Sequence, residues 1–512
     1  MNKDFNIKNK YISIKNKLSD VKFKNNFVLV ALIVINVICL SVTVLTSNVF
    51  VGLTFTLWIN IICYCLFKFK ERALLFFFSI AFFTFLIGRV VLEQMFNYNV
   101  ETFSTETNLF AERLVLFSLT VVFVTFFLLD SFIKKKDRPK KCNIYRIRRI
   151  RIISKWLFFI FSLGSILYTC ITLYIVIKRT YHFTYTQEYT NLINKNIILY
   201  VLSKTELFMP IALYVFLGTM PKKKECILPI AIQLLYLVLS LGTGQRAIIV
   251  LGVFVLIIYV VYRNSQDKDE VWISKKIVII GIISVPFILV FFVLLNHWRA
   301  GYNSSTSIFD GVRDFFYQQG YSINVIKYTY ELQDQLPQDK LYSLEFLFSG
   351  IIARIFGLPV YEGNSIAHAI DGNSLAHALA YIKLGEESYL AGHGTGTAYI
   401  AELYHDFDIF GVIIGNILVG AILLFCSRLS KEKPLTSAVK MIMIPQLLWM
   451  PRGMFTDFIG VLLRPTTFLL LIVIFGGEWV IGKLLKKYGL SIVKKFPKCK
   501  KLFAEFGVLE NV

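Results

Sequence analysis

Long apolar runs alternate with short polar segments along most of this chain. Each run is near the length that an α-helix needs to cross a bilayer, where backbone groups must satisfy one another. The pattern predicts an all-α integral membrane protein of about 12 transmembrane helices. The turn between the seventh and eighth runs is very short, and the eleventh run is short for a span. The predicted spans are 27–45, 49–67, 73–91, 114–132, 156–178, 197–217, 226–242, 247–262, 277–296, 409–426, 437–451 and 458–482.

The composition excludes a soluble protein. Of 512 residues, 56% are hydrophobic and 15% are aromatic, and the mean hydropathy is +0.62. The eight cysteines fall in predicted helices or inner segments, so neither a disulfide framework nor a structural metal site is expected. The chain begins with a basic polar stretch, and no cleavage site follows the first apolar run. We therefore expect no removable signal peptide.

Positive charge is concentrated on one side of the predicted membrane domain. The formal net charge is +22, and most of the 55 lysines and arginines lie in segments that face the same side. The positive-inside rule puts both termini in the cytoplasm. This divides the chain into a basic cytoplasmic segment at 1–26, a polytopic domain at 27–482 and a basic cytoplasmic tail at 483–512. The basic stretch 134–155 is interpreted as a lipid-contacting loop, with no nucleic acid as partner.

One long segment, 297–408, is predicted to lie outside the membrane, and long loops in compact domains are usually functional. Within it, the apolar stretch 346–360 is too short to span and favours an interfacial or re-entrant helix. A tandem nonapeptide follows, EGNSIAHAI (362–370) and DGNSLAHAL (371–379). Asn-Ser is helix-capping chemistry, so each copy should begin a short helix. The repeat is either a pair of capped turns or, with its acids and histidines, a metal or sugar site.

Four ionisable residues lie within predicted spans away from the inner ends, and such residues need partners or a functional reason. They are Arg89, Lys204, Glu206 and Arg464. All four map to the outer halves of their helices. Lys204 and Glu206 are two residues apart and point to different faces, so each should find partners on neighbouring helices. The alternative to a functional role is a buried structural ion-pair network.

Three further arginines stand beside glycines at the outer ends of predicted spans. They are Arg246 in GTGQR (242–246), Arg299 in HWRAG (297–301) and Arg452 in MPRGM (450–454). Glycine lets the backbone approach a ligand closely, and the planar guanidinium binds phosphate oxygens in a bidentate manner. Their convergence indicates an anion site at the outer leaflet. For any single arginine the alternative is a capping or snorkelling role.

The stretch GHGTGTAYIAELYHDFDIFG (392–411) precedes the tenth predicted span. A dinucleotide-binding loop is excluded, because no strand or βαβ unit surrounds it. If a helix begins near Thr397, Glu402 and His405 share one face, with Asp406 four residues after Glu402. A carboxylate beside an imidazole is a plausible acid/base pair. Gly411 and Gly415 form a small-xxx-small step, which is expected to pack this helix closely on a neighbour.

These motifs resemble those of a known family. The glycine-rich segment, AELYHDFDIFG (401–411), GTGQR and PRG together resemble the bacterial O-antigen and capsular polysaccharide polymerases, Wzy, over roughly 200–464. The resemblance implies that repeat units carried on undecaprenyl pyrophosphate are joined at the outer leaflet of the bacterial cytoplasmic membrane. Further partners would be membrane lipid and possible assembly proteins, namely a chain-length regulator and a flippase.

The resemblance also implies roles for the candidate residues. Clustered arginines can stabilise a leaving diphosphate without a metal, so no cofactor is expected. Pyrophosphate binding is assigned to Arg246, Arg299 and Arg452, with Arg464, Arg89 and Lys204. The catalytic base is assigned to Glu402 or His405, with Glu206 as another candidate. The sugar site is assigned to His393, Tyr404 and His297.

Three other classes of function remain open at this point. A transporter or flippase of lipid-linked oligosaccharide would use the same charges, but most such folds show two comparable halves, which this chain lacks. A ligase that moves a finished glycan to another acceptor would share this topology. A non-catalytic scaffold would leave the charges within the membrane unexplained.

Overall fold

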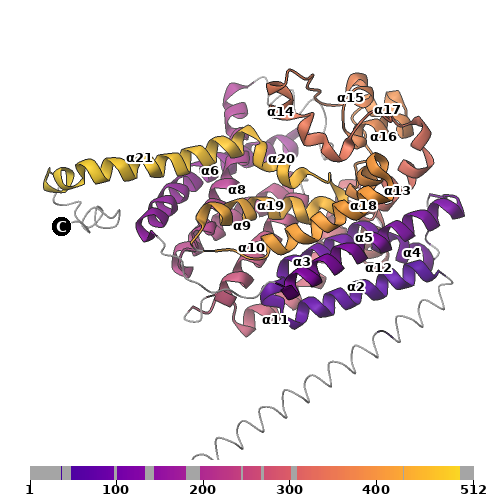
Figure 1. Cartoon of the computed structure of the whole chain (residues 1–512), viewed down its shortest axis with the longest axis horizontal. Helices are drawn as coiled ribbons and strands as arrows, with labels where there is room; N and C mark the ends of the chain where they lie inside the picture. Colours follow the sequence, from indigo (N-terminus) through magenta and orange to yellow (C-terminus); the bar gives the residue numbers. More distant parts are fainter. Residues whose placement is uncertain are drawn as a thin grey trace, which may run out of the picture.

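The computed structural model is helical throughout the part of the chain that it describes (Figure 1). The described residues are 36, 48–96, 98, 101–132, 143–179, 196–243, 246–266, 270–300, 308–430 and 432–495, and no β-strand occurs among them. The first predicted span, 27–45, therefore lies outside the described residues apart from Asn36. The all-α class that the apolar runs predict is confirmed for these ranges.

Within those ranges, nine helical segments are long and apolar enough to cross a membrane. One of them is built from three consecutive pieces, because a π-helical turn, η1, separates α3 from α4. The helices that form these segments are α2 (Val49–Phe67), α3 (Phe69–Phe82) with η1 (Phe83–Ile87) and α4 (Gly88–Phe96), α5 (Thr105–Phe132), α6 (Ile144–Arg179), α8 (Ile197–Gly218), α9 (Lys223–Gly242), α10 (Arg246–Gln266), α18 (Tyr399–Cys426) and α21 (Pro465–Lys495).

Three predicted spans differ from this set. The ninth, 277–296, falls within α11 (Lys275–Ala300), in which Lys276–Ile288 is a shorter apolar stretch. The eleventh, 437–451, forms α19 (Pro434–Trp449), which at 16 residues is shorter than a usual span. The twelfth, 458–482, is not one helix, because the chain leaves helical geometry at Arg464, between α20 (Asp457–Leu463) and α21.

Glycines allow several of these helices to approach one another at backbone distance. A Cβ atom placed on Gly420 of α18 would lie 2.7 Å from the carbonyl oxygen of Val122 on α5. A Cβ atom on Gly218 of α8 would lie 2.9 Å from the amide nitrogen of Ala438 on α19. Small residues at such crossings permit the close packing that drives helix association in lipid.

Helix α18 contains a kink that the apolar pattern does not reveal. Phe407 and Asp408 leave helical geometry, and Asp408 has φ 49° and ψ −147°. A Cβ atom on Gly411 would clash with the Leu403 carbonyl, and one on Gly415 would clash with the Leu403 side chain. The expectation that Gly411 and Gly415 form a close contact with a neighbouring helix is therefore wrong at this step. The space beside these two glycines is filled by Leu403, which lies on the other side of the kink in the same helix.

Residues 308–390 form a layer of short helices rather than an extended loop, as Figure 1 shows toward its right side. Tyr328 donates to Glu101 at 2.8 Å, and Thr107 at the start of α5 donates to Glu331 at 2.9 Å. We call the end of the bundle under this layer the loop end. The layer contains α12 (Ile308–Gln319), α13 (Ser322–Glu331), η2 (Gln333–Gln335), η3 (Tyr342–Leu347), α14 (Gly350–Ile355), α15 (Ile366–Ile370), α16 (Leu375–Leu384) and α17 (Glu386–Leu390).

Two local predictions within this layer can be compared directly with the structure. The stretch 346–360 contains the short helix α14, after which Ile355 and Phe356 are exposed. Each nonapeptide copy begins a short helix, as predicted, with Ser365 and Ser374 at the N-caps of α15 and α16. His368 and His377 stack with ring centroids 3.6 Å apart. Among the described residues, no group of three or more His, Cys, Asp or Glu side chains could hold a metal ion.

Candidate functional site

Glu402 joins two sequence motifs at the loop end. Its side chain is buried, with the residue 1% exposed. One carboxylate oxygen accepts from the Thr397 hydroxyl at 2.7 Å, in the glycine-rich segment before α18. The other accepts from the Phe455 backbone N–H at 2.8 Å, in the turn after the Pro-Arg-Gly motif. Glu402 therefore connects the segment before α18 to the turn that carries Arg452.

His405 and Glu402 do not form the pair that their spacing suggests. The Nδ1 atom of His405 lies 3.1 Å from an oxygen of Asp406 instead. Asp406 also accepts from the backbone N–H groups of Tyr342 and Ser343 and from the Ser343 hydroxyl, at 3.1, 2.7 and 2.6 Å. The imidazole is oriented by this network, and its Nε2 atom is buried without a hydrogen-bond partner among the described residues. An imidazole held through Nδ1 can accept a proton at Nε2.

Two carboxylates near Glu402 were not among the candidates from the sequence. Burial, together with the nearby charge of Asp457, raises the pKa of Glu345, in η3, to about 8. Burial also raises the pKa of Asp457, at the start of α20, while Arg464 opposes this shift. The only sequence signal was an acid inside an otherwise apolar segment, as in YSLEFLF and FTDFIG. Buried carboxylates with raised pKa values are frequent at functional sites.

Arg89 and Arg452 approach the C-terminal end of α12 from two different elements. Arg89 donates from Nη2 to the Tyr317 hydroxyl at 2.9 Å, and its guanidinium lies 4.0 Å from the centre of that ring. Arg452, in η4 (Met450–Arg452), donates from Nη1 to the backbone and side-chain oxygens of Gln319, both at 3.2 Å. A side chain on Gly320 would clash with Arg89, so a glycine is required where α12 ends.

The two arginines differ in how their charges are compensated. Arg89 is 3% exposed and lies 2.9 Å from Glu93 and 3.7 Å from Glu101. Arg452 has no carboxylate oxygen within 4.0 Å among the described residues. Burial lowers the pKa of its guanidinium, but arginine stays protonated in proteins. Arg452 therefore presents a cation without an anionic partner in the described part of the chain.

Three other candidates lie apart from this arrangement. Glu206 accepts from Thr169 at 3.0 Å and from Tyr236 at 3.3 Å, so it has the partners on neighbouring helices that were predicted. Lys204 is exposed and lies 4.5 Å from the Tyr200 ring on its own helix, without a predicted partner on a neighbouring helix among the described residues. Arg464 is exposed at the break between α20 and α21.

The candidates for the sugar site are dispersed. His393 is exposed, and its carbonyl oxygen accepts from Asn364 at 3.2 Å. The Tyr404 ring packs on Phe110, with centroids 4.8 Å apart. The side chains of Arg246, His297 and Arg299 lie outside the described part of the structure, although their backbone belongs to α10 and α11.

The nine apolar segments of the described residues indicate a multi-pass membrane protein. A family model for the O-antigen polysaccharide polymerase Wzy matches residues 25–483, nearly the whole chain, so the chain belongs to this family. No curated protein and no solved structure matches the chain. The resemblance that the motifs indicate is thus confirmed, and the protein is in general terms a polysaccharide polymerase that acts on lipid-linked oligosaccharide repeat units.

Proposed function

We propose that the protein joins repeat units carried on undecaprenyl pyrophosphate, at the outer leaflet of the bacterial cytoplasmic membrane. The observation that carries this proposal is Arg452, a partly buried cation at the loop end without a carboxylate within 4.0 Å in the described residues. An arginine without an anionic partner suits a ligand that brings its own negative charge, and a diphosphate does so. Both termini would then face the cytoplasm, as the positive-inside rule predicts.

In the proposed reaction, a hydroxyl oxygen at the non-reducing end of one lipid-linked unit attacks the anomeric carbon of the growing chain. The bond from that carbon to the lipid pyrophosphate breaks, and a glycosidic bond forms. The lipid pyrophosphate leaves with the bonding electron pair, and a base takes the hydroxyl proton. Arg452, supported by Arg89, would stabilise the charge that develops on the leaving diphosphate. Arg246 and Arg299 are retained as further pyrophosphate ligands, with Arg464 and Lys204 contacting lipid phosphate.

The geometry favours His405 over Glu402 as the base. Both oxygens of Glu402 already accept hydrogen bonds from groups of the protein. The Nε2 atom of His405 has no partner among the described residues, and Asp406 would stabilise the imidazolium that forms. Glu206 remains the alternative base. His393, Tyr404 and His297 are proposed to contact the sugars.

The test is to delete the gene and to size the lipid-linked saccharides on each face of the membrane. Single repeat units that accumulate on the outer face would support the proposal. Units retained on the inner face would contradict it in favour of a flippase. Long lipid-linked chains would contradict it in favour of a ligase. Re-expression of the wild-type gene should restore long polymer, which controls for secondary effects of the deletion.

A further inference from the structure

A cavity of about 230 Å³ opens at the loop end, between the N-termini of α2 and α5 and the C-terminal part of α4. Among its lining residues, only Leu109 is apolar. Ligand pockets are more often lined by hydrophobic side chains with a few polar groups. Neither the arginine pair at α12 nor the His405 network contributes a lining residue, so the cavity is separate from the groups assigned above.

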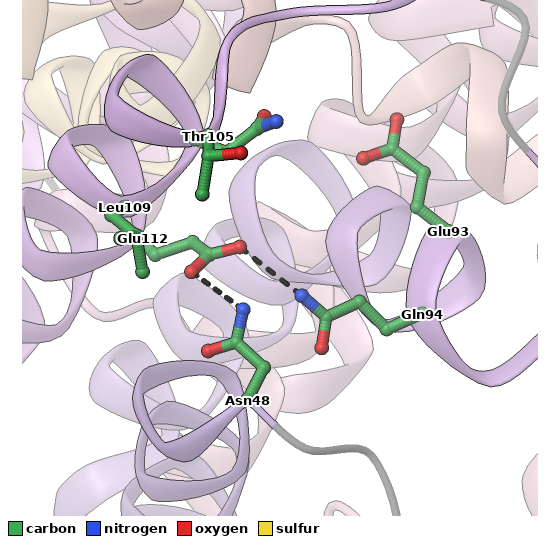
Figure 2. Close-up of a pocket in the computed structure, with 7 residues that line it drawn as sticks. Asn48, Glu93, Gln94, Thr105, Leu109 and Glu112 are labelled. Atoms are coloured by element: carbon green, nitrogen blue, oxygen red, sulfur yellow. Dashed lines mark hydrogen bonds between the residues drawn. The ribbon is translucent and has the colours of Figure 1, made fainter.

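Each side-chain amide around the cavity already donates one hydrogen bond within the protein. Asn48 and Gln94 both donate their amide N–H groups to the carboxylate of Glu112, at 2.8 and 3.2 Å. Figure 2 shows these two amides turned toward Glu112 from different sides. Asn108 donates to the backbone oxygen of Phe103 at 3.3 Å. Three of the amide N–H groups around the cavity are therefore already engaged within the protein.

The acceptors of the cavity, in contrast, are left in excess. The side-chain oxygen of Gln94 is buried and has no hydrogen-bond partner among the described residues. Glu112 is 6% exposed and has no lysine or arginine nitrogen within 4.0 Å in the same part of the chain. Unsatisfied buried acceptors are costly, so this cavity favours a ligand that donates hydrogen bonds and disfavours an anion.

We infer that the cavity binds hydroxyl groups of the glycan in a lipid-linked repeat unit, an inference that rests on the proposed function. Hydroxyls suit the site better than an ammonium group, because the ammonium of Lys327 already lies beside the Glu93 carboxylate that lines the cavity. Lys327 lies 3.6 Å from Glu93, whose other oxygen accepts from Arg89 at 2.9 Å. Glu93 thus lines the cavity and also contacts Arg89, so glycan bound here would lie beside the arginine pair that is proposed to hold its phosphate.

The decisive variant is Gln94→Leu, which removes the unpartnered acceptor together with the amide that donates to Glu112. The probe is the repeat-unit saccharide released from its lipid by mild acid, and binding to the full-length protein in nanodiscs is measured by saturation-transfer NMR. We expect affinity for the saccharide to fall about tenfold. The affinity for inorganic pyrophosphate should stay at the wild-type value. The matched control is Gln335→Leu, at an exposed glutamine of η2 that lies outside the cavity. This substitution should change neither affinity.

Thr105→Val is a second variant, for use if Gln94→Leu fails to fold. It leaves the Glu112 network intact and should weaken saccharide binding. Wild-type saccharide affinity in both folded variants would overturn the inference. Binding of ethanolamine in place of the saccharide would also overturn it, because the cavity would then be a cation site. Failure of the proposed function looks different: the saccharide would bind in a Gln94-dependent manner while membranes supplied with lipid-linked units made no polymer.

Discussion

The two ends of the helical bundle contain similar charged residues but arrange them differently. At the end opposite the loop end, Asp130 on α5 accepts from Arg72 at 3.0 Å and from Arg428 at 2.9 Å. On α6, Arg149 lies 2.8 Å from Glu478. At the loop end, Arg89 is likewise paired with Glu93 and Glu101. Arg452 differs, since it has no carboxylate within 4.0 Å in the described residues, and Glu345 and Asp457 lie on other elements without a cation at that distance.

This difference distinguishes charges that hold helices from charges that are available to a ligand. Paired charges satisfy one another, and removing one partner leaves the other buried and uncompensated. Charges of opposite sign that are not paired with each other remain available to bind a substrate that carries both a diphosphate and donor hydroxyl groups. The opposite end therefore resembles a structural network, and the loop end resembles a binding site.

The largest effect should come from Arg452→Ala, which removes the unpaired cation. We expect polymerisation in membranes supplied with lipid-linked units to fall by about 100-fold or more, because charge on the leaving diphosphate loses its stabilising donor. The rate is read from polymer length on gels over time. Arg354→Ala, at an exposed surface arginine of α14, is the control and should retain the wild-type rate. Normal polymer length in Arg452→Ala would remove this residue from the site.

Two substitutions of Glu402 distinguish a structural role, in which it joins two segments, from a catalytic role. Glu402→Gln keeps an oxygen that can accept from Phe455, so we expect near-normal polymerisation with a modest loss of stability. Glu402→Ala leaves the Phe455 N–H and the Thr397 hydroxyl unpaired and should destabilise the protein by about 2–4 kcal/mol. Thermal unfolding in detergent and polymer length measure the two effects. A fully stable Glu402→Gln protein without polymerisation would identify Glu402 as the base after all.

At the opposite end, Asp130→Asn should affect stability and leave the chemistry intact. The substitution leaves Arg72 and Arg428 without their shared anion, with an expected loss of about 1–3 kcal/mol. Polymer produced per folded molecule should match the wild type, with folded protein quantified by size-exclusion chromatography. If the specific rate also fell by more than about tenfold, the two ends of the bundle would not be functionally distinct.

The smallest effect concerns Glu345 and pH. The folded protein holds this proton up to about pH 8, whereas an unfolded chain releases it near the ordinary pKa of a glutamate, about 4.3. The contribution of the group to stability is therefore complete below about pH 4 and is lost as the pH rises toward 8. Glu345→Gln should remove this fall and raise the melting temperature at pH 8 by roughly 2–4 °C.

Unfolding curves at several pH values between 4 and 9 would measure the effect of Glu345→Gln. Glu362→Gln, at an exposed carboxylate that lies 3.5 Å from Arg354, is the matched control and should keep the wild-type pH profile. Identical pH profiles for Glu345→Gln and the wild type would contradict the raised pKa of Glu345.

Much of the fold could be predicted from the sequence, because the membrane imposes a simple pattern on it. The predicted span 49–67 coincides with α2, and 197–217 differs from α8 by one residue. The hydropathy pattern alone does not predict the kink at Asp408 or the break at Arg464, although Pro465 directly after Arg464 disfavours helical geometry there. Hydropathy reports which residues can face lipid, and local backbone geometry also depends on what packs against them.

The candidate site was only partly predictable. The sequence singled out Arg452 and Glu402, but the hydrogen bond from Phe455 to Glu402 joins residues that are far apart in the chain. Periodicity describes one helix at a time and cannot reveal such contacts. For the same reason, the sequence does not reveal Glu345, because its burial depends on α18 and α20 packing against a short 3₁₀-helix. The pairing of His405 with Asp406 depends equally on η3.

The two copies of the tandem nonapeptide pack against each other within the layer of short helices. Each copy places its histidine ring against that of the other, and Gly372 of the second copy leaves the room that His368 of the first requires. Tyr389 then connects the two copies, since it contacts His377 at 2.9 Å and donates to Ser365 at 3.2 Å. The two copies are therefore not redundant, because deleting one would expose the packing surface of the other.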